Sequence, residues 1–345
     1  MPLTYPCFKA AACHIASVFL DSAATVEKSI SFIREAAKNG ASLVAFPESF
    51  VPGFPVWAAL RPPIENHDFF RALAMQSVRR DGAEVARLCA AAREHGVYVS
   101  VGISEGTDAS VGCLWNSNLL IGPDGAILNH HRKLVPTFYE KLIWANGDAR
   151  GLRVVPTDVG RVGMLICGEN TNPLSRYALM AEGEQVHIST YPPIWPTRPP
   201  SDNSGYDLRR AIEIRAGAHA FEAKVFNIVS SALADEKLIA AVAKGDKNIR
   251  EIIERSPKSV SMILDPTGSV MGEIISGEEG IVYGEIDTAL SVEPKQFHDV
   301  VGYYNRFDIF DLKVDRSARE PARFMDTAAP VVVAENEETR PNGHG

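Results

Sequence analysis

Short apolar segments of strand character alternate with amphipathic segments of helical period along this 345-residue chain, and this alternation constrains its fold most. Strands are predicted at residues 7–18, 42–48, 97–104, 115–121, 126–135, 154–158, 161–166, 186–190, 225–230, 260–264 and 280–286. Helices are predicted at residues 21–39, 81–95, 173–182 and 208–222. Helices separate strands in both halves of the chain, while short turns join others as hairpins. The expected class is therefore α/β with mixed sheets.

No linker rich in glycine or serine divides the chain, so residues 1–316 are predicted to form one domain. Residues 317–345 are polar, small and dotted with proline, and we expect this tail to be disordered. Two internal segments do not follow the alternation. Residues 54–70 are rich in proline and aromatics, and residues 234–257 are highly charged and helix-prone.

Composition excludes several classes of protein. The chain is 46% hydrophobic and 23% charged, as in ordinary soluble proteins, and its net charge of -8 argues against a nucleic-acid partner. No apolar run approaches the roughly 18 residues that a membrane span needs. The opening MPLTYPC lacks the basic and apolar regions of a signal peptide, and five irregularly spaced cysteines form no disulfide framework. We therefore expect a cytoplasmic protein with no membrane partner.

The segment RVGMLICGENTNPLS, residues 161–175, predicts a buried strand, a tight turn and a helix. The apolar run ends at Ile166, Cys167 follows at once, and Pro173 suits the first turn of a helix. Main-chain N–H groups and a helix N-terminus would surround a cysteine on this elbow, and they are expected to favour a thiolate. From this residue alone, a buried structural cysteine is an equally good interpretation.

Reactive side chains also stand where other predicted strands give way to loops. The segments are FPE at residues 46–48, HRK at 131–133, YEKLIW at 139–144 and LICGE at 165–169. Functional groups gather at strand ends in α/β folds, and a thiol, a carboxylate and an ammonium together would supply a nucleophile, a base and an electrostatic stabiliser. Taken singly, Glu48 could cap a helix, Lys133 could be a solvated lysine, and Glu140 could form a purely structural ion pair.

Taken together, these segments resemble the carbon–nitrogen hydrolase superfamily, and within it the nitrilase branch. The motifs stand in the family's order: FPE, HRKLVPT, YEKLIW and CGENTNPLSRYALM. The resemblance spans residues 8–310 in outline. It implies a four-layer α-β-β-α sandwich of two mixed sheets, with subunits that pair as a homodimer through an outer helical face. Microbial nitrilases often extend into helical oligomers, and residues 54–70 and 234–257 fall where such nitrilases carry insertions. The resemblance implies no cofactor and no metal.

The resemblance also implies a role for each matching residue. Cys167 would attack the nitrile carbon, Glu48 would act as general base and acid, and Lys133 with the backbone N–H of Gly168 would stabilise developing negative charge. Glu140 would orient Lys133, which should stay protonated between two carboxylates. The implied reaction converts an organic nitrile and water to a carboxylic acid and ammonia through a thioimidate and a thioester. Many nitrilases carry Trp where this chain has Gly168, so the substrate range stays open.

Aromatic side chains near these motifs are candidate walls of a substrate pocket, although aromatics are also ordinary core residues. The candidates are Trp57, Tyr139, Tyr191 and Trp195. Glu169 and Asn170 are predicted to support the elbow by hydrogen bonds. We interpret His14, His187 and His219 as core histidines rather than metal ligands.

Two other functions stay open. An amidase or carbamoyl-amide hydrolase of the same superfamily would use the same thiolate on a carbonyl. The sequence CGEN favours a nitrilase, because amidase relatives more often carry aspartate two residues after the nucleophile. A catalytically silent assembly or binding protein on the same scaffold is a different class, and the intact set of Glu48, Lys133, Glu140 and Cys167 argues against it.

Overall fold

A computed structural model describes residues 3–199, 201–202 and 205–317. Of the tail predicted to be disordered, all but Ser317 lies outside these residues. None of the helices in the described ranges combines the length and the apolar character needed to cross a membrane.

The strands of the described residues join into one mixed sheet. They are β1 (Cys7–Ile15), β2 (Ala41–Ala45), β3 (Tyr98–Glu105), β4 (Trp115–Ile121), β5 (Ile127–Arg132), β6 (Val155–Thr157), β7 (Gly160–Ile166), β8 (Val186–Tyr191), β9 (Phe226–Ala232), β10 (Met262–Leu264) and β11 (Gly280–Asp287). Their order is β5-β4-β3-β2-β1-β9-β8-β7-β6, with β11 on β1 and β10 on β9. The mixed α/β class is thus confirmed. The expected separation into two sheets is not seen in these residues, because β1 pairs with both β2 and β9.

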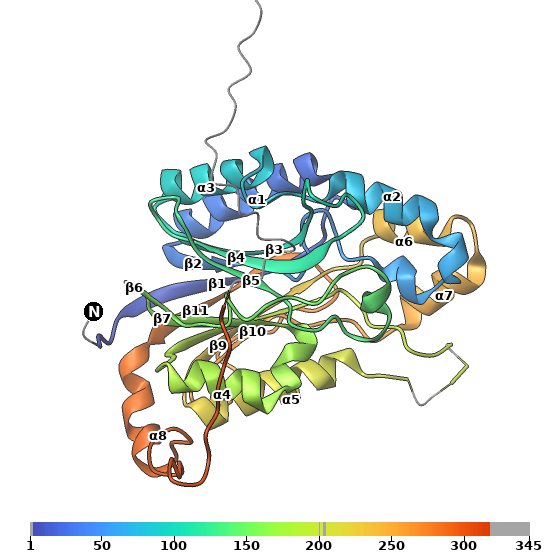
Figure 1. The fold of residues 1–345 in the computed structure, drawn as a ribbon. Coiled ribbons are helices and arrows are strands. Elements are labelled where there is room, and N and C mark those ends of the chain that lie inside the picture. The colour runs from blue at the N-terminus through green and yellow to red at the C-terminus, as the bar shows by residue number, and fades with distance from the viewer. Residues whose placement is uncertain (1–2, 200, 203–204, 318–345) are drawn as a thin grey trace, which may run out of the picture.

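Helices cover both outer faces of the folded sheet (Figure 1). Helices α1 (Ser22–Lys38) and α3 (Ala83–His95) lie over the half built from β2 to β5, and α4 (Pro173–Ala181) and α5 (Leu208–Ala223) lie over the half built from β7 to β9. Buried apolar side chains from β1, β2 and β4 meet those from β7, β8 and β9 between the halves. The carboxyl ends of parallel strands in both halves therefore lie close together, as the prediction for the site requires.

Local signals placed several helix ends correctly. The side chain of Asp21 accepts a hydrogen bond from Ala24 N at the start of α1, and Gly96 ends α3 with φ +64°. Sequence periodicity missed α2 (His67–Gln76) and α8 (Val292–Phe297). Both are short, and two short helical turns, η1 (Val56–Ala59) and η2 (Pro63–Glu65), precede α2 in a proline-rich segment that masks the helical pattern.

The two segments that broke the alternation pack against each other. Residues 234–257 form α6 (Glu236–Ala243) and α7 (Lys247–Arg255), so their helix-prone character is confirmed. Arg61 Nη2 donates to Ala243 O at 3.0 Å, and Lys244 Nζ lies 4.2 Å from the centre of the Phe69 ring. Buried side chains of both segments share one apolar cluster with Cys167. These segments therefore cover the end of the sheet where the elbow lies.

Candidate active site

Cys167 stands on the predicted elbow between β7 and α4. It follows the last residue of β7 directly and begins the short helical turn η4 (Cys167–Thr171), after which α4 starts at Pro173. Its backbone has φ +49°, a left-handed conformation that costs free energy for a residue with a Cβ. The thiol is nearly shielded from solvent, since Cys167 is 4% exposed. The turn therefore holds a strained, buried cysteine at the end of a buried strand.

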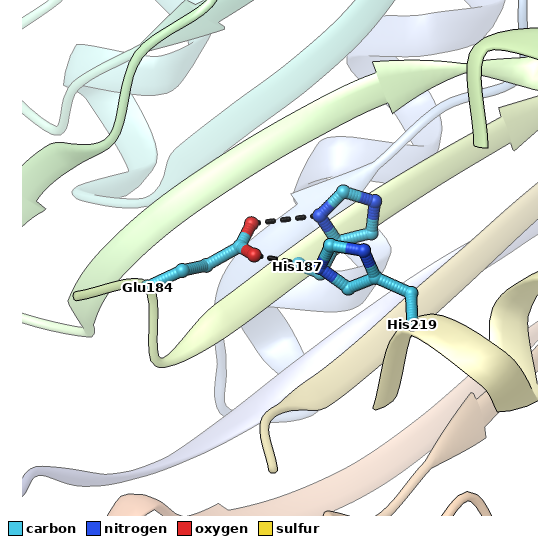
Figure 2. Close-up of side chains that lie close together, drawn as sticks. All are labelled: Glu184, His187 and His219. Atoms are coloured by element: carbon cyan, nitrogen blue, oxygen red, sulfur yellow. Dashed lines mark hydrogen bonds and ion pairs between the residues drawn. The ribbon is translucent and has the colours of Figure 1, made fainter. Parts of the chain in front are cut away.

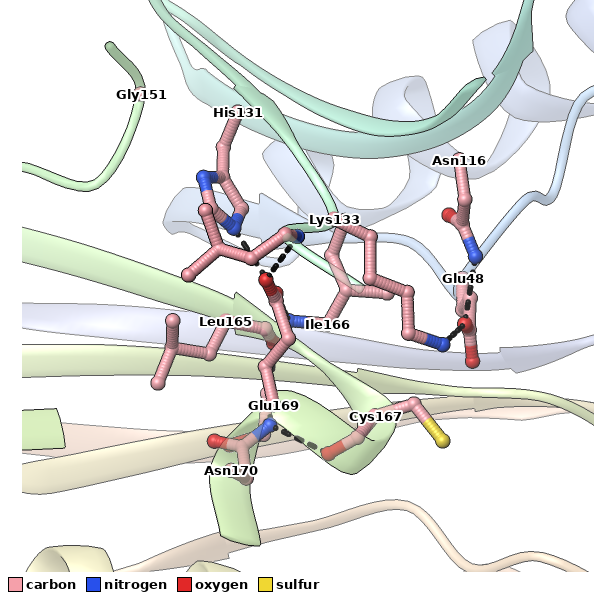
Figure 3. Close-up of polar contacts among 12 residues, drawn as sticks. Glu48, Asn116, His131, Lys133, Gly151, Leu165, Ile166, Cys167, Glu169 and Asn170 are labelled. Carbon is pink, nitrogen blue, oxygen red and sulfur yellow. Dashed lines mark hydrogen bonds and ion pairs between the residues drawn. The ribbon is translucent and has the colours of Figure 1, made fainter. Parts of the chain in front are cut away.

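Side chains of the elbow itself hold this conformation, as predicted for Glu169 and Asn170. Glu169 accepts hydrogen bonds from Ile166 N at 2.9 Å and from Leu134 N at 2.6 Å. His131 Nε2 lies 2.9 Å from the same carboxylate (Figure 3). Asn170 Nδ2 donates to Cys167 O at 3.1 Å. The role of His131 was missed, because the contact joins residues 38 positions apart and no local pattern marks it.

Lys133 lies between two buried carboxylates. Its Nζ is 2.7 Å from Glu48 Oε1 and 2.7 Å from Glu140 Oε2, and none of the three side chains is exposed. Thr137 N also donates to Glu140 Oε2, at 2.9 Å. Within the described part of the chain, Glu48 Oε2 and Glu140 Oε1 have no hydrogen-bond partner. Each carboxylate therefore keeps one oxygen that can take a proton.

Asn116 on β4 completes the setting of Glu48, and sequence reasoning missed it. Its Nδ2 donates to Glu48 Oε1 at 2.7 Å (Figure 3). Gly102 on β3 makes room for this corner, because a Cβ there would lie 2.2 Å from Pro47 O. A buried Asn inside an apolar strand was the only available signal, and it did not identify the partner.

The structure brings the four predicted catalytic residues to one place. A carboxylate oxygen of Glu48, a carboxylate oxygen of Glu140 and the sulfur of Cys167 all lie within 4.8 Å of one another. Figure 3 shows the sulfur of Cys167 on the same side as the Lys133 ammonium and the Glu48 carboxylate. Lys133 already occupies the position between the carboxylates, so the donor set suits an ion-paired lysine better than a metal. The arrangement can move a proton between sulfur and carboxylate beside a fixed positive charge.

Electrostatics correct one expectation. Burial raises the pKa of the Cys167 thiol well above its ordinary value, the Glu48 carboxylate raises it further, and the Lys133 ammonium only partly opposes this. The site therefore does not favour the expected resting thiolate, because burial disfavours a charged sulfur and Lys133 is already paired with two carboxylates. Burial disfavours the charge of Lys133 too, but Glu140 and Glu48 together hold its pKa above its ordinary value, as predicted. Burial raises the pKa of Glu140, against the effect of Lys133.

The predicted pocket residues lie in the apolar cluster that contains Cys167. They are Trp57, Tyr139, Tyr191 and Trp195, all of them buried. The rings of Tyr139 and Trp195 stack with centroids 4.3 Å apart. Among the described residues, Trp57 Nε1 and the hydroxyls of Tyr139 and Tyr191 have no hydrogen-bond partner. These buried donors place isolated polar atoms in the apolar cluster that contains Cys167.

Gly168 follows Cys167 in the first turn of η4. A Cβ at this position would lie 2.6 Å from Thr137 Oγ1. A larger side chain would therefore require Thr137 to move. Because Thr137 N donates a hydrogen bond to Glu140, this movement would also disturb Glu140. The glycine thus bears on the lysine–carboxylate cluster as well as on the elbow.

A cavity of about 890 Å³ lies elsewhere, between α4 and residues 300–316. Its lining contains Leu174, Tyr304 and Phe307 and none of the predicted catalytic residues. A smaller cleft of about 340 Å³ is bordered by Trp195 and Tyr206. We place the chemistry by the cluster of reactive groups rather than by cavity size, because a reaction needs the nucleophile and its base.

Comparison with known proteins identifies the family and agrees with this fold. The family model for carbon-nitrogen hydrolase matches residues 9–296, and the chain belongs to this family. It is 36% identical over 314 residues to Nitrilase 3 from an unknown prokaryotic organism, covering 90% of this chain and 91% of that protein. It is also 36% identical to a cyanide hydratase from Botryotinia fuckeliana, covering 93% of this chain and 86% of that protein. A carbon-nitrogen hydrolase structure from Helicobacter pylori superposes with a TM-score of 0.70 at 20% identity, covering 88% of this chain and 97% of that one.

Proposed function

We propose that this protein is a nitrilase that hydrolyses an organic nitrile to a carboxylic acid and ammonia. The observation that carries the proposal is a buried thiol beside two carboxylates, each with one unpartnered oxygen, bridged by a buried lysine. Family membership and relatives named nitrilase support the substrate class. We assign Cys167 as nucleophile, Glu48 as general base and acid, and Lys133 as electrostatic stabiliser. Glu140 orients the lysine.

The reaction starts from a protonated thiol. The Cys167 proton passes to Glu48 Oε2, the oxygen without a partner, as sulfur bonds to the nitrile carbon. Glu48 then gives this proton to the nitrile nitrogen, and a neutral thioimidate forms. Lys133 and the N–H of Gly168 stabilise negative charge on the substrate atom that carries it. Because the thiolate appears only as the bond forms, the buried site never holds an unpaired anion in its resting state.

Two molecules of water complete the turnover. The first water adds to the thioimidate carbon, with a carboxylate as base, and gives a tetrahedral intermediate. The C–N bond of this intermediate breaks, ammonia departs, and a thioester remains on the cysteine. The second water attacks the thioester, the C–S bond breaks, and the acid leaves with regeneration of the thiol. We assign Trp57, Tyr139, Tyr191 and Trp195 to the substrate pocket, because they share one buried apolar cluster with Cys167.

An amide is the alternative product of the same intermediate. If the C–S bond of the first tetrahedral intermediate breaks before the C–N bond, an amide is released instead of ammonia. The similarity to a cyanide hydratase favours testing for this outcome. An amidase or carbamoyl-amide hydrolase would use the same groups on a carbonyl, without the first addition to a nitrile.

We further propose that the two halves of the sheet act as the inner layers of a four-layer sandwich. Their outer helices cover both faces, which supports this description. By the resemblance to nitrilases, we propose a cytoplasmic homodimer that can extend into a helical oligomer.

The test is release of ammonia from a panel of nitriles and of the matching amides, with products identified by chromatography. Cys167→Ala would be compared with wild type and with Cys113→Ala, a half-buried thiol outside the site. Acid and ammonia from nitriles in the wild type and control, but not in Cys167→Ala, would support the proposal. Turnover of amides alone would replace it with the amidase assignment. No turnover of either class would favour the silent scaffold.

A further inference from the structure

A second buried charged cluster contacts the elbow through Asn170. Glu184 precedes β8, His187 lies on β8 and His219 lies on α5 (Figure 2). His187 Nδ1 is 2.7 Å from Glu184 Oε1, and His219 Nε2 is 2.7 Å from Glu184 Oε2. All three side chains are shielded from solvent. These distances are those of charge-assisted hydrogen bonds to a carboxylate.

The cluster continues to the nucleophile through Asn170. His187 Nε2 lies 2.9 Å from Asn170 Oδ1. On its other side, Asn170 Nδ2 donates to Leu165 O at 3.3 Å and to Cys167 O at 3.1 Å. The two carbonyls fix which end of the amide faces them, because an amide oxygen there would face two other oxygens. Asn170 Oδ1 must therefore point at His187.

The neighbouring serine cannot change this assignment. Ser189 Oγ lies 3.1 Å from Asn170 Oδ1 and 3.0 Å from Asn227 Oδ1. Asn227 Nδ2 donates to Ala216 O at 3.1 Å, so Asn227 also presents its oxygen to the serine. The Ser189 hydroxyl has one proton, and both of its neighbours are amide oxygens that can accept it. Ser189 therefore has no proton left to donate toward the His187 ring.

His187 is therefore held between two acceptors. Its Nδ1 faces a carboxylate and its Nε2 faces an amide oxygen, so both nitrogens must carry protons to make both hydrogen bonds. The ring is thus an imidazolium, and Glu184 is its counter-ion. The ring of His219 stacks on it with centroids 3.8 Å apart. Within the described residues His219 Nδ1 has no partner, so only one of its nitrogens needs a proton.

The sequence leaves space for this ion pair. A Cβ on Gly163 of β7 would lie 2.0 Å from Glu184 Oε1. Because strands β7 and β8 are paired in parallel with Gly163 opposite His187, any larger residue would displace the carboxylate from the ring. Glycine at this strand position therefore admits the counter-ion, although glycine weakens a strand interior.

We propose that His187 is a positioning residue for the reaction at Cys167: held as an imidazolium by Glu184, it orients Asn170, which fastens the main chain at Leu165 and Cys167. Cys167 adopts a left-handed backbone that is unfavourable by itself, so a fixed donor on its carbonyl keeps the thiol aimed at its base. Loss of this aim by about 1 Å would lower the rate on the order of 10²-fold. The inference rests on the proposed function only in taking Cys167 as the nucleophile.

Two substitutions at His187 separate its two contacts. In His187→Asn the amide nitrogen can replace Nδ1 toward Glu184 but is too short to reach Asn170. In His187→Gln it can replace Nε2 toward Asn170 while the contact to Glu184 is lost. His219→Asn is the matched control, because it removes the other hydrogen bond to Glu184 and leaves Asn170 untouched.

The measurements are the rate of Cys167 alkylation by iodoacetamide, mapped by mass spectrometry, with kcat, KM and Tm. We expect His187→Asn to lower kcat on the order of 10²-fold and to slow alkylation, with little change in KM. His187→Gln should recover part of both rates, and His219→Asn should keep them near wild type despite a similar loss of Tm. Equal losses in His187→Asn and His219→Asn would show a merely structural role and overturn the proposal.

Two further outcomes keep the inference independent of folding defects and of substrate. In the wild-type protein, ¹⁵N chemical shifts of His187 should show two protonated ring nitrogens, and one unprotonated nitrogen would overturn the proposal without any variant. If no nitrile is turned over while alkylation still depends on His187 as described, the proposed function fails and the positioning role stands.

Discussion

Lys133 Nζ lies 2.7 Å from Glu140 Oε2, and both side chains are completely shielded from solvent. The same ammonium is 2.7 Å from Glu48 Oε1, so one cation pairs with two carboxylates. A buried charge is tolerated only when it is paired and hydrogen-bonded. The cluster therefore couples the stability of this region to the chemistry proposed for Cys167.

Replacing the shared cation tests this coupling. We expect Lys133→Gln to abolish turnover and to lower the free energy of unfolding by about 3–5 kcal/mol, because two carboxylates lose their buried partner. Lys224→Gln is the control, since Lys224 is equally buried but its ammonium lies over the Phe221 ring, 3.5 Å from the centroid. Activity assays and urea unfolding would be compared. Substantial turnover in Lys133→Gln would contradict its assignment as stabiliser.

Asn116 offers a finer change in the same cluster. Asn116→Ala removes the donor to Glu48 Oε1 but leaves the Lys133 contact, so we expect a loss of about 1.5–3 kcal/mol in stability and a reduced kcat. Asn118→Ala, on the same strand, instead removes a contact to Ser100. If both variants lower kcat alike, Asn116 has no specific part in setting Glu48.

The raised pKa of the Cys167 thiol predicts how its reactivity depends on pH. Since burial and Glu48 hold this pKa well above its ordinary value, only a small fraction is thiolate near neutral pH. The rate of alkylation in the absence of substrate should therefore rise about tenfold per pH unit through pH 9. A plateau below pH 8 would reveal a preformed thiolate paired with Lys133.

Gly168 and Thr137 should be coupled. We expect Gly168→Ala to lower kcat, because its Cβ would lie 2.6 Å from Thr137 Oγ1 and push on the segment that holds Glu140. Thr137→Ala in the same chain should restore part of the loss by removing the clashing atom. Kinetics of both single variants and the double variant would give a coupling of roughly 0.5–3 kcal/mol. Additive effects would mean that Gly168 acts on the elbow alone.

The sequence predicted the elements that depend on local signals. Asp21 and Gly96 mark the ends of helices where the structure has them, and the family motifs led to Glu48, Lys133, Glu140 and Cys167, which lie together. The expected thiolate character could not be judged from sequence, because it depends on burial of the sulfur and on every charged neighbour. Burial raises the pKa of the Cys167 thiol most, Glu48 raises it further, and Lys133 opposes both.

Contacts set by strand register could not be predicted. Asn116 meets Glu48 across 68 positions, and His187 meets Asn170 only because β8 lies beside β7. No local pattern encodes such pairings. The continuity of the sheet could not be predicted for the same reason. It depends on the pairing of β1 with both β2 and β9, and these strands are far apart in the sequence.

A buried histidine far from the elbow predicts how stability depends on pH. His14 on β1 is fully buried, with Nδ1 3.0 Å from Ser261 Oγ, and burial lowers its pKa to about 4 although Glu279 opposes this. Because the folded-state pKa lies below the unfolded value of about 6.5, the folded state binds fewer protons than the unfolded state between pH 6.5 and pH 4. Stability is thus full above pH 6.5 and is lost between pH 6.5 and pH 4.

We expect the free energy of unfolding to drop by about 2 kcal/mol between pH 7 and pH 5 on account of His14 alone. His14→Asn tests this, since its amide can keep the contact to Ser261 but does not titrate. Urea unfolding at both pH values should show a drop smaller by about that amount in the variant. An equal drop in wild type and His14→Asn would mean that His14 is protonated without cost in the folded state.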